Sequence, residues 1–129
     1  MNDKCHRELV NSFLGYVKKR NLKYDVEQPY NWYGSRGIVD VVVYDKNGHN
    51  LVECKPRLDD VGGAIRQVNK QERYYPLCYG VSSYKVRSWL LFPFDSHNEK
   101  IMHENINLLS KVNIIIFNGK EFYFYEKEE

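Results

Sequence analysis

Apolar and polar residues alternate along the chain with a period that changes from segment to segment. Each period predicts a helix or a strand over its segment. In residues 3–20 the apolar positions recur every three or four residues, which predicts a helix with one buried stripe. Apolar or β-branched runs at residues 23–30, 38–44 and 51–55 predict three strands. We expect Pro29 to end the first strand, before a loop "NWYGSRG" that borders the functional site.

The second half of the chain shows the same mixture of periods. After Pro56, helical spacing with Asp59 or Asp60 as N-cap predicts a helix that Pro76 closes. Residues 84–94 predict a strand, "HNEKIMHENINLLSKV" predicts a helix, and "IIIF" and "FYFYE" predict a hairpin around "NGK". The expected fold class is α/β, in the order helix, three strands, helix, strand, helix and two strands.

Length and composition fit one globular domain over residues 1–129. A net charge of +2 does not by itself indicate a polyanionic partner, so evidence for nucleic acid must come from local charge. The sequence has no 18-residue apolar run and no apolar leader, which predicts an intracellular, cytoplasmic protein without a membrane partner. Cys5, Cys54 and Cys78 are widely spaced, and we expect reduced thiols.

The hairpin in "GIVDVVVYDKNGHNLVECKP" carries an acid on its first strand and both an acid and a base on its second. With Asn47 and Gly48 as a two-residue turn, Asp40 lies opposite Lys55. Side chains alternate between the faces of a strand, so Glu53 shares a face with Lys55 and lies diagonally from Asp40. These three side chains are predicted to converge, while the opposite face takes Val39, Val41, Val43, Val52 and Cys54.

Two carboxylates placed in this way can share one hard divalent cation, because Mg²⁺ and Mn²⁺ prefer oxygen ligands. A lysine beside the cation can orient a water molecule or stabilise charge that builds up on a phosphate. This is the chemistry of phosphodiester hydrolysis. The alternative is an Asp40–Lys55 salt bridge on a solvated sheet face, with no chemical role.

The stretch "VDVVVYDKNGHNLVECK" resembles the signature of the PD-(D/E)xK nucleases, also called restriction-endonuclease-like. It is most similar to the N-terminal nuclease domain of type I restriction subunits and, less closely, to archaeal Holliday-junction resolvases. The resemblance implies a three-layer core around a mixed sheet, in the order α-β-β-β-α-β and then α-β-β. It implies that Asp40 and Glu53 bind Mg²⁺, for which Mn²⁺ substitutes. The Cys54 carbonyl would be a further ligand and Lys55 would be catalytic.

Two further positions of the superfamily pattern each have two matches in this chain. Glu8 in "HRELV" matches an acid that resolvases carry on the first helix, and Glu27 is the alternative third carboxylate. The Gln of a Gln-x-x-x-Tyr pattern corresponds to Gln67 by its distance from the lysine, or to Gln71 with Tyr75 by the spacing inside the pattern. We take Glu8 as the additional metal-ligand candidate and Gln67 as the catalytic candidate, and both choices stay open.

Basic residues on the second long helix are the candidates for DNA contact, because a ridge of positive charge suits phosphates. The ridge consists of Arg66, Lys70 and Arg73. We also predict DNA contacts from Gln71, beside the ridge on the same helix, and from Arg36 in the loop before the site. Trp32, Tyr33 and Trp89 could stack on bases, although aromatic residues in a small β-rich domain usually belong to the core.

These patterns together predict a metal-dependent DNA nuclease that hydrolyses phosphodiester bonds. The alternative function is a non-catalytic module on the same fold that binds nucleic acid or protein. A chain of this length has little room for a separate recognition domain, so selectivity is expected from a homodimer, a larger protein complex or DNA shape.

Overall fold

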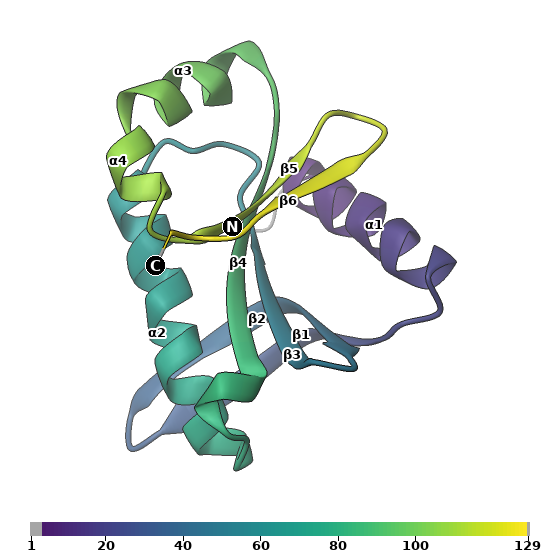
Figure 1. Ribbon diagram of the computed structural model, residues 1–129, viewed down its shortest axis with the longest axis vertical. Helices are drawn as coiled ribbons and strands as arrows, with labels where there is room; N and C mark the ends of the chain where they lie inside the picture. The colour runs from purple at the N-terminus through teal and green to yellow at the C-terminus, as the bar shows by residue number, and fades with distance from the viewer. Residues whose placement is uncertain (1–3, 129) are drawn as a thin grey trace.

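The computed structural model describes residues 4–128. Within them, a six-stranded sheet forms the middle of the molecule and helices cover both of its faces (Figure 1). In chain order the elements are α1 (Lys4–Lys19), β1 (Lys23–Trp32), β2 (Ser35–Asp45), β3 (Gly48–Cys54), α2 (Val61–Tyr79), the 3₁₀ turn η1 (Ser83–Lys85), β4 (Val86–Pro93), α3 (Ser96–Glu104), α4 (Ile106–Leu109), β5 (Asn113–Phe117) and β6 (Phe122–Tyr125). The first residue of the predicted first helix, Asp3, lies outside the described residues.

Strand order in the sheet follows the chain, from β1 at one edge to β6 at the other. The neighbours β1, β2 and β3 are antiparallel, β3, β4 and β5 run parallel, and β6 returns antiparallel to β5. The two parallel connections contain α2 and then α3 with α4, and these helices lie on one face while α1 covers the other (Figure 1). This is the predicted α/β class, with the three layers of a restriction-endonuclease-like core.

Each face of the sheet has its own apolar core. On one face α1 packs its stripe of Leu9, Phe13 and Val17 against the sheet. On the other face α2 contributes residues such as Val61 and Val68 to a second cluster. Each buried aliphatic or aromatic side chain stabilises the fold by roughly 1.5–3 kcal/mol. No helix within residues 4–128 is long and apolar enough to cross a membrane.

The prediction that Pro29 ends β1 is wrong, because β1 is an edge strand. Pro29 pairs with Ile38, and the strand continues to Trp32. A proline has no N–H to donate, but on an edge strand the missing donor can face solvent. The predicted loop is consequently reduced to a turn of two residues, Tyr33 and Gly34.

Two helix boundaries also differ from the prediction. The helix α2 begins after Asp60, whose side chain accepts a hydrogen bond from a backbone N–H, and it runs through Pro76. Pro76 removes only one hydrogen bond in the last turn, and Gly80, with φ 65°, then ends the helix in the left-handed conformation. The predicted helix after β4 is divided at Asn105, whose side-chain amide donates to the Ile101 carbonyl.

Candidate active site

The turn between β2 and β3 lies one residue earlier than predicted. Asp45 pairs with Gly48, so Lys46 and Asn47 form the turn. Oδ1 of Asp45 accepts hydrogen bonds from the backbone N–H groups of Asn47 and Gly48, at 2.8 and 3.1 Å. A Cβ atom on Gly48 would lie 2.0 Å from the Lys85 carbonyl oxygen. The register is therefore set by the Asp45 cap and by this close backbone contact.

This register places Asp40 opposite Glu53, where the prediction had Lys55. The last ladder pair joins Val41 to Val52, and continuing the same register by one residue joins positions 40 and 53. At this point β2 and β3 separate, since β2 continues beside β1 and β3 continues beside β4. The error is a shift of two residues in the pairing, which leaves side chains on the faces that they had.

The alternation of faces along β2 breaks at Asp40. Val41 packs in the cluster under α1, whereas Val39 packs with Tyr75 in a cluster on the α2 face, contrary to the prediction. The residue opposite Asp40 on β1 is Glu27, whose φ of 49° is left-handed. This conformation is uncommon for a residue with a long side chain and disturbs the strand pair locally. Asp40 therefore stands at an irregular point of β2.

The two carboxylates and their neighbours lie at different depths. Oδ2 of Asp40 accepts a hydrogen bond from the Cys54 N–H at 2.8 Å and lies 3.3 Å from Nε2 of His6 in α1. The Glu53 side chain is 5% exposed, and its Oε2 lies 3.8 Å from Nζ of Lys55. Lys55 is only partly buried, so the lysine stands at the mouth of the site and the glutamate at its base.

Burial dominates the electrostatics of the site. Burial and, to a smaller extent, the nearby charge of Asp40 together raise the pKa of Glu53 to about 8, although Lys55 acts in the opposite direction. Burial also raises the pKa of Tyr30, with a smaller contribution from the Glu53 charge, so Tyr30 is a neighbour of the site. Burial raises the pKa of Cys54 well above its usual value, and its thiol stays protonated. These effects favour the protonated form of the Glu53 carboxyl near neutral pH.

Three buried polar side chains on the α2 face have atoms without a hydrogen-bond partner in residues 4–128. These atoms are Oε1 of Glu53, both amide atoms of Gln71 and Oγ of Ser88. Glu53 pairs with Leu90 and Ser88 with Leu51, and both leucines belong to clusters on this face. Buried polar groups in proteins almost always have partners, so the cluster is suited to a polar group that the chain itself does not supply.

Gln71 lies on the buried stripe of α2 and is 1% exposed. Val68, about one turn earlier, belongs to the same core cluster as Leu90, and Tyr75, one turn later, to the same cluster as Leu51. Gln71 therefore lies over the part of the sheet between the cluster of Leu90 and the cluster of Leu51. The prediction that Gln71 contacts DNA beside the basic ridge is wrong, because Gln71 faces the sheet and is buried.

The two predicted accessory carboxylates are placed differently. Glu8 is exposed and forms an ion pair with Lys4 at 3.7 Å. The α1 side chain that reaches Asp40 is that of His6, which the sequence reasoning did not select. Glu27 is the β1 neighbour of Asp40 in the sheet, but its own side chain is exposed.

The predicted basic ridge lies on the exposed side of α2. Arg66, Lys70 and Arg73 are exposed, and Gln67 is half-buried at the edge of the same helix. Nζ of Lys70 donates a hydrogen bond to the carbonyl oxygen of Arg36 at 2.7 Å. This contact joins the ridge to β2 and brings Arg36, which is distant in sequence, next to the three basic residues of α2.

We call the point where β2 and β3 separate, at Asp40 and Glu53, the fork. Its carboxylate oxygens fit a hard divalent cation that also takes ligands from outside the chain. Among residues 4–128, no three His, Cys, Asp or Glu side chains are grouped closely enough to hold a metal ion by themselves. Mg²⁺ usually keeps several waters and takes one or two protein carboxylates together with phosphate oxygens. Asp40 and Glu53, the latter with an unpartnered Oε1, supply such a pair.

No family model and no curated protein matches this chain. Solved structures do share its fold. A fdxN element excision controlling factor protein from Anabaena variabilis superposes with a TM-score of 0.63 at 13% identity, covering 88% of this chain and 90% of that one. An XisH family protein from Nostoc punctiforme PCC 73102 superposes with a TM-score of 0.62 at 10% identity, covering 95% and 100% of the two chains.

A repair endonuclease from Pyrococcus abyssi superposes less well, with a TM-score of 0.46 at 20% identity over 93% of this chain and 48% of that one. The identities of the first two structures are low enough that their likeness concerns the fold alone. That fold is the α/β core whose six-stranded sheet and flanking helices are described above.

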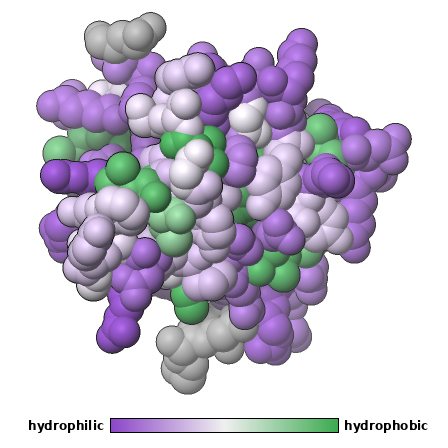
Figure 2. Space-filling model, turned by 90° about the horizontal axis from the view of Figure 1, so that it is seen from below, coloured by the Kyte–Doolittle hydropathy of each residue, from purple (hydrophilic) through white to green (hydrophobic). Residues whose placement is uncertain are grey.

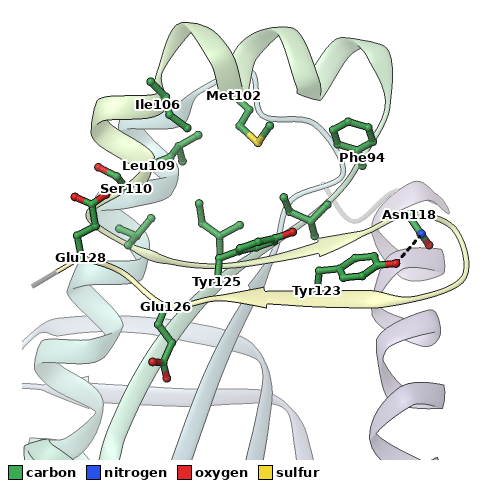
Figure 3. Close-up of a pocket in the computed structure, with 13 residues that line it drawn as sticks. Phe94, Met102, Ile106, Leu109, Ser110, Asn118, Tyr123, Tyr125, Glu126 and Glu128 are labelled. Carbon is green, nitrogen blue, oxygen red and sulfur yellow. Dashed lines mark hydrogen bonds between the residues drawn. The ribbon is translucent and has the colours of Figure 1, made fainter.

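Away from the two carboxylates, an apolar pocket of about 510 Å³ lies between α3, α4 and the β5–β6 hairpin (Figure 3). Met102 and Ile106 reach toward it from the helices, and Tyr123 and Tyr125 line it from β6 (Figure 3). Its lining contains none of the predicted site residues. The pocket offers apolar surface and few groups for acid, base or metal chemistry, so it is a poor candidate for the reaction.

Proposed function

We propose that the chain is a metal-dependent deoxyribonuclease whose active site is the fork between β2 and β3. The observation that carries the proposal is the pair formed by the half-buried Asp40 and the buried Glu53, with Nζ of Lys55 3.8 Å from Oε2 of Glu53. The alternative, a salt bridge on a solvated face, does not explain why Glu53 is buried with an unpartnered oxygen and a pKa raised to about 8.

The two carboxylates would hold Mg²⁺, or Mn²⁺ in its place, with the Cys54 carbonyl as a further oxygen. When bound, the cation would make a water molecule more acidic and polarise a phosphoryl oxygen. Glu53 would give up its proton as it becomes a ligand. Lys55, at the mouth of the site, would orient the attacking water and face the charge that grows on the phosphate oxygens.

The reaction that these residues support is hydrolysis of a phosphodiester bond. The water oxygen forms a bond to phosphorus, the bond from phosphorus to the 3′ oxygen breaks, and that oxygen takes a proton. The resemblance to PD-(D/E)xK nucleases implies these products, a 5′-phosphate and a 3′-hydroxyl. The same resemblance favours relatives among type I restriction subunits and archaeal Holliday-junction resolvases.

DNA is the proposed partner, and exposed basic residues border the surface next to the site. The phosphate contacts would come from Arg66, Lys70, Arg73 and Arg36, since each is exposed on α2 or β2. A homodimer or a larger complex would supply sequence selectivity, and a DNA substrate implies a cytoplasmic place of action. In the alternative function the same surface binds DNA and the carboxylates have no catalytic role.

The experiment uses a panel of labelled linear, nicked, flapped and four-way DNAs with Mg²⁺, Mn²⁺ or EDTA. The wild type is expected to cut at least one of them only with the cation, and Lys55→Ala is expected to cut none. The matched control is Lys46→Ala, which removes an exposed lysine from the turn of the same hairpin and should leave cleavage unchanged. No cleavage of any DNA, together with no heat of Mn²⁺ binding in calorimetry, would leave the non-catalytic module as the function.

A further inference from the structure

The tip of the β1–β2 hairpin places an aromatic residue where the backbone does not favour one. The turn residues are Tyr33, with φ 50°, and Gly34, with φ 89°. A left-handed φ suits Gly, Asn and Asp and is unfavourable for a bulky side chain. Tyr33 is 92% exposed, and its ring meets Trp32 edge to face at 4.9 Å between centroids. Packing in the fold therefore does not explain a tyrosine at this position.

The tip is firmly supported although it projects from the molecule. Oδ1 of Asn31 accepts a hydrogen bond from the Gly34 N–H at 3.0 Å, which fixes the turn. Behind the turn, the Asn31 N–H donates to Sγ of Cys78 in α2 at 3.5 Å, and the hydroxyl of Tyr79 donates to the Pro29 carbonyl. An aromatic ring on a rigid support loses little conformational freedom when it stacks on a ligand.

The surroundings of the tip favour nucleic acid over protein. Arg36 lies three residues from Tyr33, and Lys70 joins the basic ridge of α2 to it through the Arg36 carbonyl. On the underside of the molecule, hydrophobic side chains form small patches separated by hydrophilic ones (Figure 2). A protein interface usually has a continuous apolar centre, whereas a nucleic acid requires positive charge for phosphates and exposed rings for bases.

We infer that Trp32 and Tyr33 form a stacking platform for an unpaired base, and that the substrate is duplex DNA next to unpaired bases, such as a fork or a flap. The inference rests on the proposed function in taking DNA as the ligand. In an intact duplex the faces of the bases are covered by their neighbours, so a protruding ring finds a free face only where pairing ends.

The position of the platform also predicts where the cut falls. Seven residue steps along the chain separate Tyr33 from Asp40 (40 − 33), and at about 3.3 Å per residue an extended strand spans at most roughly 23 Å over that length. This length equals about seven base pairs of B-DNA at about 3.4 Å each. Cleavage of a forked substrate is therefore expected within about seven base pairs of the fork.

The test measures binding without cleavage, by fluorescence anisotropy in EDTA with matched duplex, forked and single-stranded oligonucleotides. The wild type should bind the fork about tenfold more tightly than the duplex, and 2-aminopurine at the first unpaired position should change its fluorescence on binding. Tyr33→Asn should remove both effects and leave duplex affinity unchanged. Asparagine tolerates a left-handed φ, so this variant should fold with an unchanged or higher Tm.

A matched control is Tyr84→Ala, because Tyr84 is a tyrosine of η1 that is 81% exposed and lies outside the hairpin. This variant should keep the preference for forks. A wild type with equal affinity for fork and duplex overturns the inference, as does a Tyr33→Asn variant that keeps the preference. A Tyr33→Asn variant that changes sedimentation from dimer to monomer without affecting fork binding would identify the tip as a protein interface, and this also overturns it.

The two proposals fail separately. A protein that cuts duplex DNA without preferring forks keeps the nuclease function and overturns the stacking platform. A protein that prefers forks through Tyr33 but cuts nothing keeps the platform and overturns the nuclease.

Discussion

On the α2 face of the sheet, the carboxyl of Glu53 at the fork between β2 and β3 and the amide of Gln71 are buried, whereas the pocket under α3 and α4 is lined mainly by aliphatic and aromatic side chains. Burial of apolar groups stabilises the fold by itself. Burial of a polar group without a partner costs about 1–3 kcal/mol, and more when the group carries a charge. Folding alone therefore explains the buried side chains of the pocket, such as Leu109 and Val112, but not those of the fork.

The difference gives a way to separate the two regions by substitution. A change in the pocket should lower stability and leave the chemistry unchanged. A change at the fork should remove the chemistry while the fold keeps its stability or gains some. Each of the following predictions tests one side of this contrast.

The largest effect is expected from Asp40→Asn. The amide keeps the size of the side chain, and its oxygen can still accept the Cys54 N–H, but one of the two carboxylates proposed to bind the cation is lost. Cleavage should fall by at least about a thousandfold and Mn²⁺ affinity should fall with it, while DNA binding persists because a carboxylate repels phosphates. Single-turnover cleavage and calorimetry measure these effects, and a variant that cuts within tenfold of the wild type contradicts the proposed role.

Glu53→Gln should stabilise the metal-free protein at high pH. The pKa of Glu53 is raised in the folded state to about 8, from 4.5. The folded state thus binds more protons than the unfolded state between these values, and stability falls as pH rises through them. A glutamine side chain does not titrate and has no such loss, so the variant should match the wild type near pH 4 and exceed it at pH 9 by an amount on the order of 4 kcal/mol.

Urea unfolding in EDTA at several pH values checks this prediction. The control is Glu27→Gln, which changes an exposed carboxyl on the neighbouring strand and should give a difference that is small at every pH. A stability difference for Glu53→Gln that does not grow with pH would mean that Glu53 is ionised in the folded protein at neutral pH.

In the pocket, Leu109→Ala should cost stability without affecting the site. Leu109 is fully buried, and truncation of such a side chain leaves a cavity that costs about 3 kcal/mol. Urea unfolding measures this loss, and calorimetry of Mn²⁺ binding at a temperature where the variant is folded measures the site. A large loss of Mn²⁺ affinity would show that the two regions are coupled.

The smallest effect on stability is expected from Gln71→Leu, which replaces two unpartnered amide atoms by an apolar side chain of similar size. The fold should gain about 1 kcal/mol. Cleavage should fall if Gln71 is the glutamine of the Gln-x-x-x-Tyr pattern. Gln67→Leu is the matched variant one turn earlier, and loss of cleavage in that variant alone would assign the pattern to Gln67.

The element order and the amphipathic stripe of α1 could be predicted because hydrophobic periodicity is a local property of the sequence. The register of the β2–β3 hairpin could not, because it depends on the Asp45 cap and on the contact of Gly48 with Lys85, which is distant in the chain. Asp40 and Glu53 still meet, because continuing the observed register sets the two positions opposite each other, although the faces of β2 do not alternate regularly at Asp40.

The parts of the site that come from tertiary packing were not visible in the sequence. His6 reaches Asp40 only because α1 crosses the sheet at this point. Tyr30 lies over Gly37, where a Cβ would be 2.6 Å from the tyrosine hydroxyl, and the only local signal for this contact is the glycine itself. Gln71 was misplaced because a polar residue on a helix normally faces solvent, and the rule fails where a site is buried.

The separation of β2 and β3 at the site has a consequence for the order of events during folding. The strands β1, β2 and β3 are neighbours in sequence and pair by short loops, whereas β4 reaches β3 only after α2 has crossed the sheet. Local contacts form sooner than distant ones, so Asp40 and Glu53 are expected to meet first in an open, hydrated hairpin. While the hairpin is open, Glu53 is expected to have the acidity of an ordinary carboxylic acid. Docking of α2 and β4 then buries it, and a late folding phase near neutral pH should take up one proton from solution.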